Sequence, residues 1–295
     1  MEPWIVYTLL ATLLYGVLNF LFKAAAERGH DPDGLVNIVG LTVALLSFGT
    51  LLATTRAPGA ALTRAMLAYA FFNGLFFALG SLAKMAALKR APAAVVFPLN
   101  RLNTVGVMLI GLLFFGETPR PLQWIGIAAG LGVLGLIVFE PRRGFSAARH
   151  AANKAGIALA AASALFTALS MTVGKLLAES AENRLAYIGA SYTLVFLFTL
   201  GRQTAARRRG NAPSIRPGPE RLLFGGVIGG LNFAGYFLVL QAFGSGPISL
   251  SQAIFSSSII VPILLSRWLY RERFTPARAA ALALAILSVA LISWK

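Results

Sequence analysis

The sequence predicts an all-α integral membrane fold of ten transmembrane helices, arranged as two inverted repeats of five helices. Three observations carry this prediction. Hydrophobic residues make up 57% of the 295 residues and charged residues only 12%, whereas roughly a quarter of the residues in a soluble domain are charged. The apolar residues also fall into ten runs, and several Pro and Glu residues between these runs recur at one fixed spacing.

Each apolar run is close to the ~20 residues that an α-helix needs to cross the hydrocarbon core of a bilayer. The first run is too long, and its flank too poor in Lys and Arg, for a cleaved signal peptide, so it counts as a span. The predicted spans are residues 3–24, 34–54, 65–88, 93–115, 121–139, 155–177, 185–200, 222–243, 248–269 and 276–294.

A set of Pro and Glu residues in the first half recurs 155 residues later in the second half. Both Glu and Pro pairs close one apolar run and open the next, which indicates a repeated unit of helix, turn and helix. A weaker correspondence, at 152 residues, relates a Lys and Glu pair at the end of the first span to one at the end of the sixth. The recurring residues are Pro92, Glu117, Pro121, Lys23 and Glu27 in the first half, and Pro247, Glu272, Pro276, Lys175 and Glu179 in the second.

The duplication divides the chain into two repeats, residues 1–140 and 155–295, joined by a basic loop at 141–154. Because each repeat has an odd number of spans, homologous halves must enter the membrane in opposite directions. Inverted repeats of this kind are typical of secondary transporters. Since both halves lie in one chain, we expect a functional monomer.

The distribution of basic residues indicates how the chain is oriented in the membrane. The net charge is +16, but most Lys and Arg residues lie in loops or at helix ends, where they face lipid headgroups and set the topology. No nucleic-acid partner is therefore needed to explain the charge. Loop charges favour both termini on the outer side of the cytoplasmic membrane.

Several chemistries have no candidate residues. The chain has no cysteine, which excludes disulfides, thiolate metal sites and Cys nucleophiles. The two histidines, His30 and His150, fall in loops without a second ligand at metal-binding spacing. No nucleotide-binding motif or catalytic triad is visible. We therefore predict that the protein is not an enzyme and binds no cofactor or metal.

Arg101 is the principal candidate for substrate binding, because it lies well inside the fourth span, between Asn100 and Asn103. A guanidinium at this depth costs at least several kcal/mol unless it faces water, a carboxylate or a substrate. All ten acidic residues lie at helix ends or in loops. Arg101 would then bind an anionic group of the transported molecule. The alternative is that Arg101 only joins helices through backbone carbonyls and Asn side chains.

Further polar side chains at helical spacing are candidate walls of the same site. In the first span they form one continuous stripe, which should face the protein interior. For each such residue, a hydrogen bond between helices is the competing explanation. The candidates are Tyr15 and Asn19 in the first span, Asn73 and Lys84 in the third, Asn100 and Asn103 in the fourth, Asn232, Tyr236 and Gln241 in the eighth, and Gln252 and Ser256 in the ninth.

The chain resembles the EamA-type branch of the drug/metabolite transporter superfamily over nearly its whole length. The resemblance rests on the ten spans in two halves and on the short helix connections. These connections are residues 86–92, Gly116-Glu117-Thr118 followed by Pro121, residues 242–247, and Arg271-Glu272-Arg273 followed by Pro276, where the second copy lacks the Gly before Glu.

The resemblance implies a central cavity, lined mainly by spans 1, 3, 4, 6, 8 and 9, that works by alternating access. It also implies termini in the cytoplasm, against the loop charges, so the orientation stays open. Members of the superfamily move amino acids, organic cations, nucleotide sugars and sugar phosphates.

Three functional hypotheses follow for a multi-pass protein of the bacterial cytoplasmic membrane. The first is a transporter of a small anionic or zwitterionic metabolite, such as an amino acid or a related carboxylate or phosphate compound. Because no acid lies at the depth of Arg101 to relay protons, a facilitator or exchanger is the simpler form. The second is a flippase for a lipid or lipid-linked phosphate. The third is a scaffold or sensor without transport.

Overall fold

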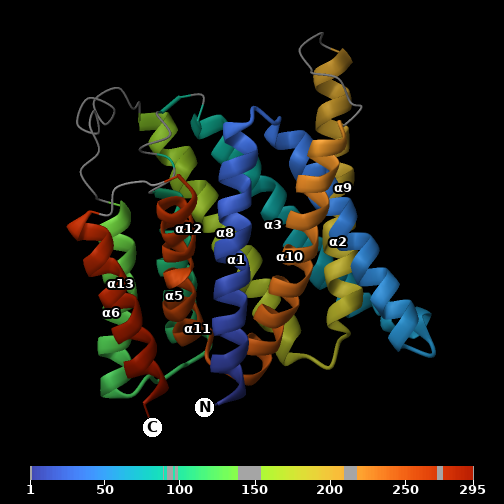
Figure 1. Ribbon diagram of the computed structural model, residues 1–295. Helices are drawn as coiled ribbons and strands as arrows, with labels where there is room; N and C mark the ends of the chain where they lie inside the picture. The colour runs from blue at the N-terminus through green and yellow to red at the C-terminus, as the bar shows by residue number, and fades with distance from the viewer. Residues whose placement is uncertain are drawn as a thin grey trace.

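The computed structural model describes residues 2–88, 90–91, 96, 99–138, 154–208, 218–270 and 275–294. Its long helices run roughly side by side, and both chain termini lie at one end of the bundle, the terminus end (Figure 1). We call the opposite end, where α1 ends and α2 begins, the basic-loop end. The elements are α1 (Pro3–Glu27), α2 (Pro32–Thr54), η1 (Pro58–Ala61), α3 (Arg64–Leu88), α5 (Asn103–Phe114), α6 (Pro121–Val138), α8 (Lys154–Glu179), α9 (Arg184–Arg208), α10 (Pro219–Ser245), α11 (Ile248–Phe255), η2 (Ser256–Ile259), α12 (Ile260–Tyr270) and α13 (Pro276–Ser293).

The helices correspond to the predicted spans. Eight of the described helical segments, one of them running from α11 through η2 into α12, are long and apolar enough to cross a membrane. Two shorter apolar helices, Asn103–Phe114 and Pro121–Leu136, lie in the fourth and fifth spans. The predicted all-α membrane fold is confirmed. Two predicted repeat residues, Pro92 and Glu272, lie outside the described residues, as do His150 and residues 141–153 of the connecting loop.

Helix starts follow local sequence signals. The carboxylate of Asp31 accepts a hydrogen bond from the Gly34 amide at 2.7 Å at the start of α2. The hydroxyl of Thr275 accepts one from the Arg278 amide at the start of α13. Both helices, like α6, begin with proline. Proline suits this position because its missing N–H has no partner in the first helical turn anyway.

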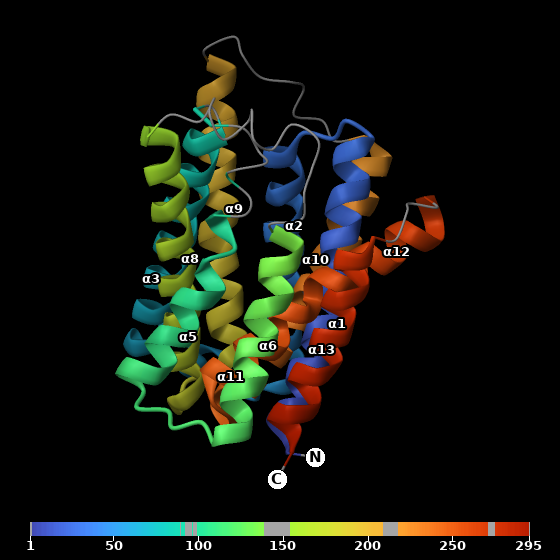
Figure 2. The ribbon, with the colours of Figure 1, turned by 90° about the vertical axis from the view of Figure 1, so that its left-hand side faces the viewer.

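The two halves pack across each other in matched pairs. Helix α3 packs on α8 and α1 packs on α10, which are equivalent contacts when the halves are exchanged. Each of α2, α5 and α6 packs on its own counterpart, respectively α9, α11 and α13. Figure 1 shows α6 with α13 at one edge of the bundle and α2 with α9 near the other, and Figure 2 shows the α6 and α13 edge from the side.

The outer surface of the bundle is apolar. Many large hydrophobic side chains on it are exposed, including Leu113 at 75%, Phe114 at 83% and Ile286 at 64%. Polar side chains are instead found inside, where Thr8, Ser170 and Gln252 are buried. This reversal is expected when lipid rather than water surrounds the helices, because unpaired polar groups are costly in hydrocarbon.

The fourth and ninth spans are not the continuous helices that hydropathy predicted. In the fourth span, a turn at Arg101 and Leu102 precedes α5. In the ninth, the tighter helix η2 interrupts the path from α11 to α12 at Ser256. The Ser256 hydroxyl donates to the Ala253 carbonyl at 2.6 Å and to the Gly130 carbonyl at 3.0 Å. Serine hydroxyls compete in this way with the helical backbone. Arg101 and Ser256 occupy equivalent repeat positions, so both interruptions fall at the same place.

Candidate functional site

Two networks of polar side chains join helices of both halves in the interior. In the first network, the Asn73 amide of α3 donates to the backbone carbonyl of Ser170 at 2.9 Å and to its hydroxyl at 3.0 Å. The same amide donates to the Tyr236 hydroxyl at 3.2 Å. Tyr236 shares a further hydrogen bond of 3.1 Å with the hydroxyl of Tyr187. Helices α3, α8, α9 and α10 are thereby connected.

The second network lies beside the first. The Tyr15 hydroxyl of α1 donates to the Asn232 side-chain carbonyl at 3.1 Å, and the Asn232 amide donates to Tyr192 at 2.9 Å. The rings of Tyr192 and Tyr236 then meet edge to face, with 6.0 Å between centroids. The structure therefore brings together four predicted residues, Tyr15, Asn73, Asn232 and Tyr236.

The tyrosines of α9 were not among the predicted residues, because the predicted cavity did not include the seventh span. A signal was available. Tyr187 and Ser191 lie four residues apart in an apolar span, which places two polar groups on one helix face. Both are fully buried, and Tyr187 contacts Tyr236.

Removing the Asn73 amide should destabilise the bundle. Asn73→Ala deletes hydrogen bonds to α8 and α10, so we expect a loss of about 0.6–2 kcal/mol, as measured for polar contacts between membrane helices. The measurement is the thermal unfolding midpoint of purified protein in detergent. Thr50→Ala is the control, because the Thr50 hydroxyl bonds only a backbone carbonyl of its own helix. Equal midpoints for the two variants would contradict this role of Asn73.

Lys84 lies in α3, and Arg101 lies in the turn before α5. The Ser163 hydroxyl of α8 donates to the Gly80 carbonyl at 2.7 Å and to the side-chain oxygen of Asn100 at 2.8 Å. Gly80 precedes Lys84 by about one helical turn, and Asn100 is adjacent to Arg101. Ser163 thus brings the segment of α3 that carries Lys84 and the segment that carries Arg101 to the same region of the interior. Both side chains are half-buried, so they lie deep in the protein while part of each stays accessible.

Neither cation has an anionic partner among the residues that the structure describes. Every carboxylate whose side chain is described interacts elsewhere, most of them near the helix ends. The contacts are Glu2 with Trp4, Asp31 with Gly34, Glu117 with Ile248 and Ser249, Glu179 with Lys175, Glu182 with Thr63, and Glu220 with Arg28. A basic side chain inside a membrane protein is costly unless it faces water, an opposite charge or a bound molecule.

The remaining predicted residues are divided between the interior and the helix ends. Asn19 and Asn103 are half-buried. The Gln252 amide donates to the Met171 sulfur at 3.4 Å, while Gln241 accepts from Arg184 near the terminus end. Ser256 holds η2 against α6 through Gly130. Gln241 and Ser256 therefore join helices in this conformation.

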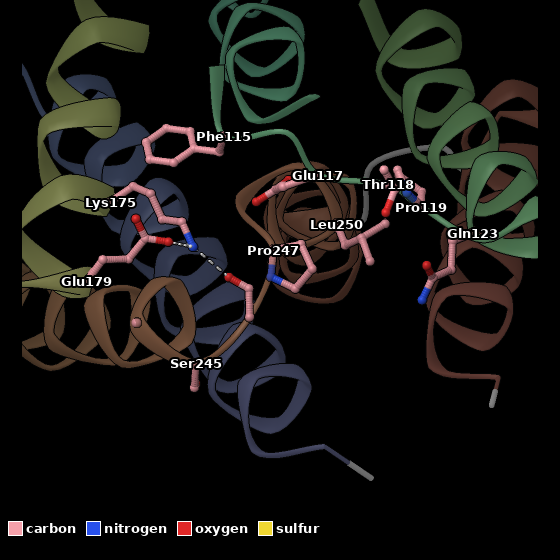
Figure 3. A pocket seen from close by; sticks show the side chains of 12 residues that line it. Phe115, Glu117, Thr118, Pro119, Gln123, Lys175, Glu179, Ser245, Pro247 and Leu250 are labelled. Atoms are coloured by element: carbon pink, nitrogen blue, oxygen red, sulfur yellow. Dashed lines mark hydrogen bonds and ion pairs between the residues drawn. The ribbon is translucent and has the colours of Figure 1, made fainter. Parts of the chain in front are cut away.

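The terminus end holds a pocket of about 480 Å³ (Figure 3). None of the predicted binding residues lines it. A second cavity, of about 10 Å³ and bordered by Thr8, Gln252 and Phe255, has room for no more than about one water molecule. The pocket is lined by Phe115, Glu117, Thr118, Pro119, Gln123, Lys175, Glu179, Gly244, Ser245, Gly246, Pro247 and Leu250.

Comparison with known proteins decides the family. The sequence matches the EamA-like transporter family twice, over residues 2–139 and 154–294, which together span nearly the whole chain. The chain belongs to this family. It is thus a multi-pass membrane transporter of the drug/metabolite type. Membership of this family indicates a transporter rather than an enzyme.

Curated relatives of this EamA-like transporter carry no substrate assignment. An uncharacterized protein of Methanocaldococcus jannaschii is 29% identical over 144 residues, covering 48% of this chain and 98% of that protein. An uncharacterized transporter from the cobO 3' region of a Sinorhizobium species is 41% identical over 68 residues, 23% of this chain and 48% of that one. A protein of known crystal structure superimposes on this chain with a TM-score of 0.78 at 20% identity. The match covers 98% of this chain and 96% of the other, and it shows that the two share a fold.

Proposed function

We propose that this EamA-like transporter moves a small anionic or zwitterionic metabolite across the cytoplasmic membrane of a bacterium. The observation that carries the proposal is the pair of interior cations, Arg101 and Lys84, without a described counter-charge. A carboxylate or phosphate group between them would satisfy both, and the planar guanidinium suits bidentate binding of such groups. An amino acid or a related carboxylate or phosphate compound is the substrate class.

The walls of the site suit a molecule with polar and apolar parts. Tyr15, Asn73, Asn232 and Tyr236 supply hydroxyl and amide groups from three helices, and several of these groups already bond one another. A substrate would exchange some of these bonds for its own. Sites of this composition fix orientation with a few polar groups among aromatic surfaces.

We further propose alternating access by a monomer, working as a facilitator or exchanger. No described carboxylate lies beside Arg101 to relay protons, which supports transport without a proton relay at this site. The duplicated chain supplies both halves of the pathway. Relatives occur in an archaeon and a bacterium, which agrees with a place in a prokaryotic cytoplasmic membrane.

A ligand screen tests the substrate class. Purified protein in detergent is heated with amino acids, organic acids, sugar phosphates and organic cations. A ligand at 100 times its Kd stabilises the native state by about 2.7 kcal/mol, so carboxylate or phosphate compounds should raise the unfolding temperature. Hits are then tested for exchange in proteoliposomes. Stabilisation by cations alone would contradict the proposal, and lipid translocation without any soluble hit would favour a flippase instead.

A further inference from the structure

We propose that Lys175 and Glu117 form a latch that holds the transport pathway closed at the terminus end. Lys175 joins the sixth span to the end of the eighth, and Glu117 joins the turn after the fourth span to the start of the ninth. This inference concerns the conformational cycle and does not depend on the charge of the substrate. Figure 3 shows Lys175 and Glu179 beside Pro247, with Glu117 near the same proline.

Lys175 closes α8 against the end of α10. Only 4% of the residue is exposed. Its ammonium donates to the Phe243 carbonyl at 2.7 Å and to the Gly246 carbonyl at 2.9 Å. Glu179, one turn further along α8, neutralises it at 2.8 Å. The last carbonyls of a helix have no partner within the helix and carry partial negative charge, so a cation there both satisfies and neutralises them.

Glu117 joins the first half of the chain to the second through hydrogen bonds. The turn after α5 uses Gly116, whose φ of +61° is left-handed and free of strain only for glycine. It directs the next residue toward α11, where the Glu117 carboxylate accepts hydrogen bonds from the Ile248 amide at 2.6 Å and the Ser249 amide at 2.9 Å. These amides have no helical partners, and a carboxylate there is favoured by the helix dipole.

The packing of the helices is asymmetric in the way that a closed latch predicts. Helix α8 packs against α10, but the equivalent helices α1 and α3 show no comparable packing among the described residues. Lys23 occupies in α1 the place that Lys175 occupies in α8. In this conformation, therefore, the helices close the pathway at the terminus end, where α8 packs on α10. At the basic-loop end α1 and α3 pack less closely. Alternating access would result if α8 and α10 separated while α1 and α3 came together. Lys23 would then take the role of Lys175 in the opposite state.

A single reporter cysteine tests the latch. The chain has no cysteine, so Ser251→Cys creates a unique thiol at a residue that is 2% exposed and borders the small cavity next to Phe243. The rate of reaction with a charged maleimide in detergent then reports opening. Adding Lys175→Met should raise this rate by about tenfold or more, because it removes several hydrogen bonds to a charged group.

Matched variants separate the latch from general loosening. Lys154→Met removes an exposed lysine at the other end of α8 and should leave the rate unchanged. Lys23→Met should lower the rate, because it weakens closure in the opposite state. If Lys175→Met fails to fold, Glu117→Gln replaces it and should also raise the rate. Equal rates in the parent and the latch variants, or an equal increase in Lys154→Met, would overturn the proposal. Because no ligand is added, these results are independent of the substrate screen.

Discussion

Arg101→Gln should lower the affinity for an anionic substrate by about 100-fold, since a buried charged group that loses its partner costs roughly 2–5 kcal/mol. The amide keeps much of the side-chain volume but has no charge and cannot form the same bidentate contact. The measurement is the concentration of a carboxylate or phosphate ligand that gives half-maximal thermal stabilisation. Exchange in proteoliposomes should fall in parallel.

Two further variants locate this effect. Lys84→Gln should weaken binding less than Arg101→Gln, because an ammonium binds as a point charge without the planar fork of the guanidinium. Arg28→Gln is the control, as Arg28 is exposed and pairs with Glu220 at the basic-loop end. If Arg101→Gln destabilised the protein while leaving the ligand response intact, Arg101 would be a structural residue that joins helices.

Gly111→Ala should destabilise the protein by about 1–3 kcal/mol, the usual cost of overpacking. An added methyl carbon would lie 2.8 Å from a carboxylate oxygen of Glu117 and 3.1 Å from the Ser249 amide nitrogen. It would therefore intrude between the two groups whose hydrogen bond joins the halves. This cost exceeds the gain in helix propensity, about 1 kcal/mol, that alanine brings. The midpoint of thermal unfolding measures the difference.

Gly135→Ala is the matched control, because nothing lies within 4 Å of the methyl carbon that it would add to α6. This variant should be as stable as the parent or slightly more so. A similar loss of stability in both variants would show that the membrane helices are sensitive to any such substitution. It would contradict a specific contact between Gly111 and the Glu117 carboxylate.

The membrane helices were predictable because the bilayer imposes a strong and simple constraint. Each membrane-spanning segment must make the hydrogen bonds of its own backbone internally and present apolar side chains to lipid. Each therefore appears as a long apolar run in the sequence. Proline marks several starts for a local reason, and α6 and α13 begin at the predicted Pro121 and Pro276. The candidate residues Tyr15, Asn73, Asn232 and Tyr236 were found from helical spacing, and they do lie in the two interior networks.

The contacts of these residues were not predictable in the same way. Glu117 was recognised only as a recurring residue, yet its carboxylate binds amides 131 and 132 residues away. Lys175 was likewise recognised only as a recurring residue at a helix end, yet it is buried against the end of α10. Hydropathy also gave no sign of the turn at Arg101, because a break in a helix hardly changes the composition of the span.

The sequence by itself determined the class of protein, the ten apolar spans and the family, because hydropathy and recurring residues are properties of the chain. Only the tertiary structure decided which polar groups meet, that Ser163 joins the segments of Lys84 and Arg101, and that Lys175 is buried against the end of α10. Those features arise from packing between helices far apart in sequence. In lipid, burying polar groups is favourable only when helices supply partners for one another.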